Sequence, residues 1–223
     1  MISIAIDGPA GAGKSTLSRA VAEKLGFIYV DTGALYRTVG LKFMNLGFDT
    51  ELNCDIDAVL STTDINIKFV NGEQRVMLDG NDVSDKIRTP LASMMASAVS
   101  AKPAVRAFLL DMQRKLAKEH DVIMDGRDIG TVVLPNASLK IFLTASVETR
   151  ATRRYRELIE KGMDVSYDDI YKDIEKRDYN DSHREIAPLK PAPDSVIADT
   201  TGCEFNESMQ ILLNIISERL GIS

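Results

Sequence analysis

The segment ISIAIDGPAGAGKST at the start of the chain constrains the fold more than any other part of the sequence. Its first part, from Ile2 to Asp7, is mostly apolar and predicts a buried strand. A glycine-rich turn from Gly8 to Gly13 follows, and the apolar residues between Lys14 and Leu25 fall on one stripe of a predicted helix. The order strand, turn, helix is typical of a parallel sheet covered by helices.

The glycine-rich turn also predicts a ligand. Residues 8–15 match the pattern G-x-x-x-x-G-K-[ST], placed between a strand and a helix as this phosphate-binding motif requires. Backbone N–H groups of such a turn converge on phosphate oxygens, and the helix N-terminus contributes positive charge. We expect ATP to bind here, with Lys14 on the β- and γ-phosphates and the Ser15 hydroxyl on Mg²⁺. The predicted ATP-binding residues are Gly8, Pro9, Ala10, Gly11, Ala12, Gly13, Lys14, Ser15 and Thr16.

The strand–helix rhythm continues with a strand at 27–31 and a helix at 34–46, and it then breaks. Between Ser61 and Ser84 apolar and polar residues alternate around Asn71-Gly72, a strong hairpin signal, which predicts a small antiparallel insert. Prolines 90 and 103 each open a predicted helix. Further strands are predicted at 122–125, 139–145 and 195–199, and further helices at 146–161, from Ser166, and over 209–220.

Bulk properties exclude several classes of protein. A chain of 223 residues suits one α/β domain with a small insert, and a net charge of −6 argues against broad nucleic-acid binding. Two cysteines and two histidines, far apart in the sequence, are too few for a disulfide framework or a histidine metal centre. Because neither a secretory signal nor an apolar run of membrane-spanning length is present, we expect a cytoplasmic protein without a membrane partner.

Arginine clusters favour a small-molecule kinase. The sequence has no Asn-Lys-x-Asp motif of a GTPase, and a motor or helicase ATPase would be larger or carry a basic footprint. Phosphoryl transfer depends on neutralising charge, which several arginines on different segments can do. The predicted helix at 146–161 carries Arg150, Arg153, Arg154 and Arg156. A solvated helix, in which these arginines pair with neighbouring glutamates, is the alternative.

A second unusual stretch is MDGRDIGT, which begins at Met124 at the end of a predicted strand. Here Arg127 stands between Asp125 and Asp128, with glycines on either side. A salt-bridged turn would explain this pattern, and so would a site that binds a polar ligand.

Five segments together resemble the bacterial cytidylate kinases. In chain order they are GPAGAGKST, VDTGALYR, MASAVSA…VR, DGRDIGTVV and RDYNDSHREIAPL. Members of that family are nucleoside monophosphate kinases, which phosphorylate CMP and dCMP with ATP and Mg²⁺. The resemblance spans nearly the whole chain and implies a monomeric P-loop kinase-type α/β fold. It implies a core at 1–46, 119–148 and 186–223, a monophosphate-binding region at 47–118 with the β insert near 61–84, and an arginine-rich helical lid at 149–185.

The resemblance also implies which residues bind CMP. Ser97, Arg106 and Asp128 match positions that read the cytosine. Thr32, Arg37 and Arg127 match the monophosphate environment, where many relatives have serine in place of Thr32. Arg177, Asp181 and Arg184 match a group that contacts sugar and phosphate. The predicted catalytic residues are Lys14, Arg127, Arg153 and Arg184.

Elementary chemistry agrees with this assignment of Asp128. Cytosine carries an exocyclic amine, which a carboxylate can accept, whereas uracil presents an oxygen at the same position. That oxygen would leave an ionised Asp128 unpaired, and unpaired buried polar groups discriminate strongly between ligands. Arg127 would then neutralise the acceptor phosphate. No general base is needed, because a phosphate monoester near pH 7 already has unprotonated oxygens.

Three alternatives remain open at this point. The acceptor could be UMP, dTMP or a non-nucleotide such as shikimate, or the chain could be an ATP-binding regulatory module without turnover. Asp7 and Asp125, which end two predicted strands, could each hold Mg²⁺ through water or could only anchor a turn. The expected partners are the small molecules ATP, CMP and dCMP, and no nucleic acid.

Overall fold

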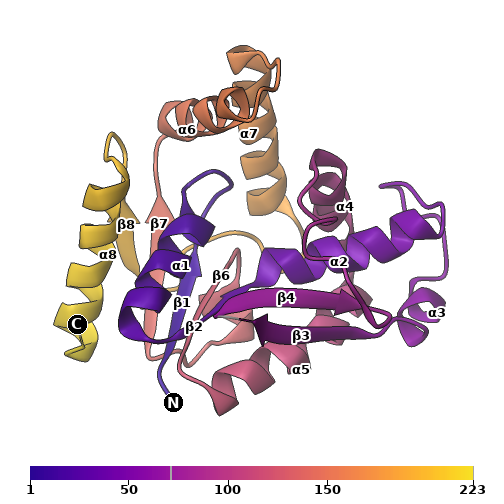
Figure 1. Ribbon diagram of the computed structural model, residues 1–223, viewed down its shortest axis with the longest axis horizontal. Coiled ribbons are helices and arrows are strands. Elements are labelled where there is room, and N and C mark those ends of the chain that lie inside the picture. Colours follow the sequence, from indigo (N-terminus) through magenta and orange to yellow (C-terminus); the bar gives the residue numbers. More distant parts are fainter. Residues whose placement is uncertain (71, 223) are drawn as a thin grey trace.

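Five parallel strands form the centre of the molecule. A computed structural model describes residues 1–70 and 72–222, so that Asn71 of the predicted hairpin turn lies outside the described residues (Figure 1). The strand order is β2-β6-β1-β7-β8, and every neighbouring pair is parallel. The strands are β1 (Ser3–Asp7), β2 (Ile28–Asp31), β6 (Val122–Gly126), β7 (Leu139–Thr144) and β8 (Val196–Asp199).

Helices cover both faces of this sheet, as the alternation of apolar residues in β1 shows. Ile4 and Ile6 pack with Leu17 and with residues of the C-terminal helix, while Ala5 packs with Val30 and other residues on the opposite face. Successive side chains of a strand point to opposite faces, so both faces of β1 are buried. The helices are α1 (Lys14–Leu25), α2 (Thr32–Asn45), α3 (Ile56–Ser61), α4 (Pro90–Ser100), α5 (Pro103–Glu119), α6 (Val147–Glu160), α7 (Tyr167–His183) and α8 (Phe205–Leu220).

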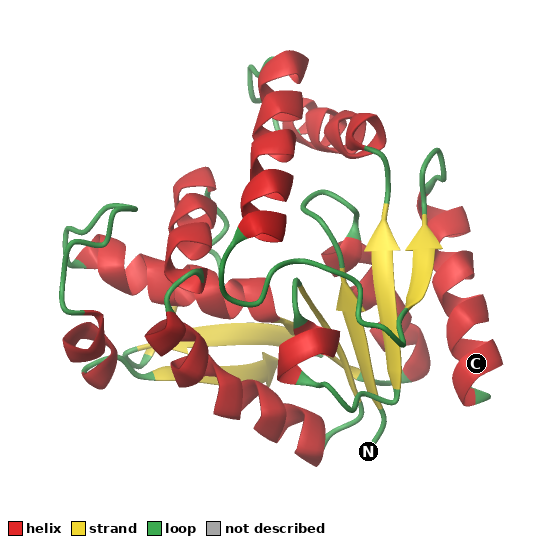
Figure 2. Ribbon diagram, turned by 180° about the vertical axis from the view of Figure 1, so that it is seen from behind, coloured by secondary structure: helices red, strands yellow, loops and turns green. Residues whose placement is uncertain are grey.

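A second, antiparallel sheet confirms the predicted insert. It consists of β3 (Ile65–Val70), β4 (Glu73–Leu78) and the short β5 (Asn81–Asp82). The inner residues Ile65, Val76 and Leu78 are buried in one cluster with residues of α2, α4 and α5. Figure 2 shows the two sheets as separate sets of strands with helices around both, and in Figure 1 α6 and α7 project above the central sheet.

Most predicted elements are present, and the differences have local causes. Helix α2 begins at Thr32 rather than at Ala34, because the Asp31 carboxylate accepts the N–H of Ala34 at 2.8 Å and caps the helix. The short elements α3, β5 and the π-helix η1 (Ile129–Val133) were not predicted. Within residues 1–70 and 72–222, no helix is both long and apolar enough to cross a membrane.

Candidate nucleotide-binding site

The turn between β1 and α1 is shaped by its glycines. A Cβ atom on Gly8 would lie 1.9 Å from the carbonyl oxygen of Leu143 in β7, so that only glycine fits there. Gly13 adopts the left-handed conformation, with φ of 87°, directly before α1. In the part of the chain that the structure describes, no side chain caps α1. The first N–H groups of α1 are therefore available to an anion.

Lys14 is the first residue of α1, and its side chain lies inside this turn. Its side chain is buried, and Nζ donates to the carbonyl oxygen of Pro9 at 2.7 Å. Burial lowers the pKa of Lys14, and the nearby Arg127 lowers it further, whereas Asp125 raises it. A bound phosphate would bring negative charge to this ammonium group and raise its pKa again.

Asp125, at the end of β6, accepts hydrogen bonds from two hydroxyl groups. Ser15 Oγ donates to Asp125 Oδ2 at 2.9 Å, and Tyr29 Oη donates to Oδ1 at 2.9 Å. Burial raises the pKa of Asp125, and repulsion from Asp31 adds to the shift. A serine hydroxyl beside a carboxylate offers the hard oxygen ligands that Mg²⁺ prefers, so these residues fit the predicted ion.

Asp7 ends β1, the strand next to β6, but unlike Asp125 it accepts hydrogen bonds from backbone groups. Its two carboxylate oxygens accept the backbone N–H groups of Ile129 and Gly130, each at 2.7 Å. Burial raises the pKa of Asp7 to about 6. Asp7 therefore anchors the start of η1.

Asp128 lies at the centre of a buried charged cluster. It is 4% exposed and forms ion pairs with Arg106 of α5 and, at 3.4 Å, with Arg184 at the end of α7. Burial raises the pKa of Asp128, whereas both arginines lower it. Three segments far apart in the sequence thus bring together three of the residues predicted to bind CMP.

Arg127 forms neither of the local ion pairs that MDGRDIGT suggests. Its Nε donates to Asp181 Oδ2 at 2.7 Å, and these two residues are 54 positions apart. The alternating charges of this stretch therefore point to partners on other elements. Asp181 lies in the last turn of α7, and Arg184 is the residue that caps the C-terminus of this helix.

The other residues predicted to bind CMP have different partners and are not part of the Asp128 cluster. Thr32 Oγ1 donates to the carbonyl oxygen of Asp125 at 2.7 Å, and Arg37 pairs with Asp31 at 2.8 Å. Ser97 is exposed on α4. Arg177 lies 3.8 Å from Asp173 of its own helix and is not in contact with the Asp128 cluster.

The arginines of α6 divide into two kinds. Arg150 is 3% exposed, pairs through two nitrogens with Asp178 of α7 at 2.9 and 2.5 Å, and donates to the Ala10 carbonyl. Arg153 donates to the carbonyl oxygens of Thr200 and Cys203 at 2.9 and 2.8 Å. Of the other two arginines, Arg154 is partly exposed and pairs with Glu157, and Arg156 is exposed and lies 3.9 Å from Glu204. The solvated-helix interpretation therefore applies to Arg154 and Arg156 only.

Comparison with known proteins decides the family. The model of the cytidylate kinase family matches residues 4–218. The cytidylate kinase of Caldicellulosiruptor bescii is 54% identical over 214 residues, which cover 96% of this chain and 95% of that protein. This chain belongs to the cytidylate kinase family. The cytidylate kinase of Caldicellulosiruptor saccharolyticus is 52% identical over 99% of this chain and 97% of that protein.

A solved structure supports the fold alone. An uncharacterized protein from Eubacterium ventriosum superimposes with a TM-score of 0.54 at 11% identity, over 98% of this chain and 100% of that one. At such low identity the likeness carries no information about substrate.

The sequence analysis did not predict several residues that contact the site in this member of the cytidylate kinase family. Asp31 and Asp178 form ion pairs with Arg37 and Arg150. Tyr29 donates a hydrogen bond to Asp125, and Gln74 accepts one from the backbone of Asp31. Asp31 and Asp178 lie within VDTGALYR and RDYNDSHREIAPL, so the motifs carried a signal for them. Tyr29 and Gln74 carried no such signal in the sequence, because each is a single polar residue within a predicted strand.

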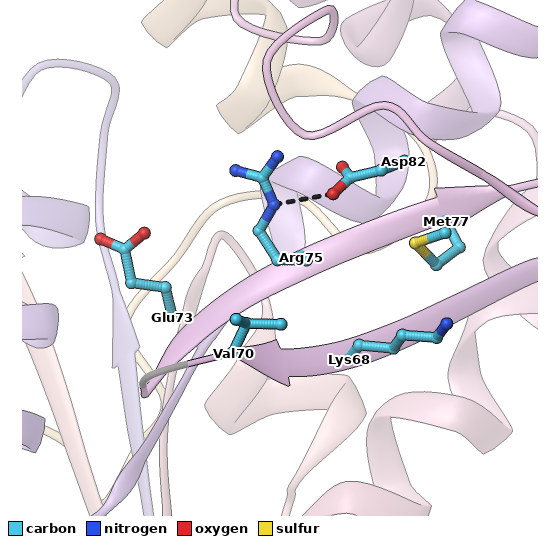
Figure 3. A pocket seen from close by; sticks show the side chains of 6 residues that line it. All are labelled: Lys68, Val70, Glu73, Arg75, Met77 and Asp82. Atoms are coloured by element: carbon cyan, nitrogen blue, oxygen red, sulfur yellow. Dashed lines mark hydrogen bonds and ion pairs between the residues drawn. The ribbon is translucent and has the colours of Figure 1, made fainter.

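Residues of the insert line two surface hollows. One is lined by residues of β2, α2 and the insert, among them Tyr29, Arg37 and Gln74, and so adjoins the candidate site. The other, of about 590 Å³, lies on the outer face of the insert (Figure 3). Its Arg75 already pairs with Asp82 at 2.8 Å and with Asp85 at 3.1 Å. The Arg75 guanidinium in this outer hollow is therefore already paired.

Proposed function

We propose that this protein transfers the γ-phosphoryl group of ATP to CMP or dCMP, giving CDP or dCDP and ADP. The observation that carries the proposal is the buried cluster of Asp128 with Arg106 and Arg184, near the phosphate-binding turn and Lys14, in a chain of this family. A carboxylate held in this way can accept the exocyclic amine of cytosine and rejects the oxygen of uracil.

ATP would occupy residues 8–16. Lys14 would contact the β- and γ-phosphates, and the N-terminus of α1 would bind phosphate oxygens. The Ser15 hydroxyl would ligate Mg²⁺, with Asp125 holding the ion through water, because the two side chains are hydrogen bonded at 2.9 Å. When bound, Mg²⁺ neutralises phosphate charge.

CMP would bind between the insert region and the core. Ser97, Arg106 and Asp128 would contact the base, and Thr32, Arg37 and Arg127 the phosphate. Arg177, Asp181 and Arg184 would contact sugar and phosphate. Because Arg37, Arg127 and Arg184 pair with carboxylates in the ligand-free chain, phosphate binding exchanges one anionic partner for another.

Transfer requires orientation and charge more than covalent chemistry. We infer a lid at 149–185 that closes on a core of 1–46, 119–148 and 186–223, with 47–118 covering CMP. Closure excludes water and brings Arg153 and Arg184 toward the phosphates beside Lys14 and Arg127. An oxygen of the CMP phosphate attacks the γ-phosphorus, a new P–O bond forms, the bond to the β-phosphate oxygen breaks, and ADP leaves.

ADP formation with a panel of acceptors tests this function. The panel is CMP, dCMP, UMP, dTMP, AMP, GMP and shikimate with ATP and Mg²⁺, each against a blank without acceptor. We expect turnover with CMP and dCMP and much weaker turnover with the others. Turnover with another acceptor would overturn the assignment of Asp128, and ATP binding without any turnover would indicate a regulatory module.

A further inference from the structure

Gln74 connects the insert to the end of β2. In Figure 1 the start of β4, where Gln74 lies, is beside β2. The Gln74 side-chain oxygen accepts the backbone N–H of Asp31 at 2.8 Å, and its amide nitrogen donates to the Asp31 carbonyl at 3.3 Å. Since β2 is an edge strand of the central sheet, its outer backbone groups need such partners.

Asp31 in turn holds Arg37. One oxygen of its carboxylate caps α2 through the N–H of Ala34, and the other accepts from Arg37 Nη2 at 2.8 Å. A Cβ atom on Gly33 would lie 3.0 Å from Arg37 Nη1, so the absence of a side chain at Gly33 makes room for the guanidinium. Arg37 Nε is buried without a partner among the described residues. The Arg37 guanidinium is thus held by Asp31 while its buried Nε–H, unpaired in the described part of the chain, stays free to donate.

A second link between insert and core is weaker. Arg19 of α1 lies 3.4 Å from Glu73, the neighbour of Gln74, but the side chains are 45% and 62% exposed. Exposed ion pairs of this kind contribute little. The paired hydrogen bonds of Gln74 are therefore the specific contact between the insert and the end of β2.

We propose that Gln74 is a positioning residue for the acceptor phosphate: it fixes the backbone of Asp31, and Asp31 orients Arg37. The insert then adjusts CMP binding through Gln74, Asp31 and Arg37 without contacting the transferring phosphoryl group. This inference rests on the proposed function, in which Arg37 binds the CMP phosphate.

Steady-state kinetics of Gln74→Met tests it. Methionine keeps the length of the side chain and removes both hydrogen bonds. We expect KM for CMP to rise about 5-fold, the effect of losing one or two hydrogen bonds, with KM for ATP changed less than about 2-fold. Asn66→Leu, which removes an exposed amide from the neighbouring strand β3, is the matched control and should change neither constant.

A double-mutant cycle with Arg37→Ala separates positioning from general weakening of the fold. If Gln74 acts through Arg37, Gln74→Met should have less than about a 2-fold effect on KM for CMP in the Arg37→Ala background. An effect that persists there, an unchanged KM in the single variant, or equal changes for both substrates would overturn the inference. Should Gln74→Met not fold, Gln74→Glu keeps the size and the acceptor but loses the donor bond of 3.3 Å, and a smaller rise in KM for CMP is expected, again with KM for ATP unchanged.

The same assays separate this inference from the function on which it rests. Absence of CMP turnover by the wild-type chain would overturn both. Normal wild-type turnover with an unaffected Gln74→Met variant would overturn the positioning role alone.

Discussion

The ATP side and the CMP side of the site are built in different ways. The phosphate-binding turn is local, because its ligands are consecutive backbone groups and the adjacent Lys14 and Ser15. The side that we propose for CMP is assembled from ion pairs between distant residues, such as Arg127 with Asp181 and Arg106 with Asp128, which are 54 and 22 positions apart. The residues of the local site lie on one strand, one turn and one helix that are consecutive in the chain, whereas the ion-paired site requires the whole fold. Four predictions test this difference.

The largest effect is expected on the local side. Lys14→Met should lower kcat on the order of 10³-fold, since it removes a preorganised cation from the transferring phosphate, and should leave the melting temperature nearly unchanged. Steady-state assays and thermal unfolding measure the two quantities. Full turnover by Lys14→Met would refute this account of the turn.

Ion pairs between distant residues should instead contribute stability, and Arg150 with Asp178 is such a pair. Arg150→Met leaves the partly buried Asp178 unpaired, together with the carbonyls of Ala10 and Ala145, so we expect a loss of about 3 kcal/mol in the free energy of unfolding. The matched change Arg154→Met removes an exposed pair and should alter stability by less than about 0.5 kcal/mol. Urea unfolding of both variants gives the comparison, and equal losses would contradict it.

Asp7 links the two sides, and its titration predicts a pH dependence. Burial raises its pKa from 3.8 to about 6, so the folded chain holds this proton more tightly than the unfolded chain. The stability that Asp7 contributes is therefore full below about pH 4 and is lost as the pH rises through 6, by on the order of 3 kcal/mol.

Subtracting the free energy of unfolding of Asp7→Asn from that of the wild type between pH 3.5 and 7 isolates this titration. The difference should fall as the pH rises. A flat or rising difference would show that the two backbone N–H bonds to Asp7 outweigh its burial.

The smallest of the four effects concerns substrate choice. Asp128→Asn keeps the shape of the side chain but can donate to the uracil oxygen, and it pairs less strongly with Arg106 and Arg184. We expect the ratio of kcat/KM for CMP over UMP to fall about 30-fold, which is within the range that one hydrogen-bonding group discriminates. An unchanged ratio would remove Asp128 from base recognition.

Much of the fold could be predicted from residue patterns. Helix α1 spans the predicted residues and is followed by Gly26, whose positive φ suits the cap. The helix predicted from Ser166 is present as α7, and the Ser166 side chain caps it by accepting the N–H of Asp169. The insert was predicted by alternation in β3 and β4. The π-helix η1 was not, because the Asp7 contacts that hold its first residues come from 122 and 123 positions away.

The sequence by itself determined the phosphate-binding turn, the parallel sheet, the insert and the family, because each depends on residues that are close in the chain or on motifs in fixed order. Only the tertiary structure decided which carboxylate each arginine meets. The spacing of residues in the sequence could not predict that Arg127 pairs with Asp181. It also could not predict the hydrogen-bond partners of Asp7 and Asp125. Ion pairs depend on which elements pack side by side, and periodicity along the chain does not contain that information.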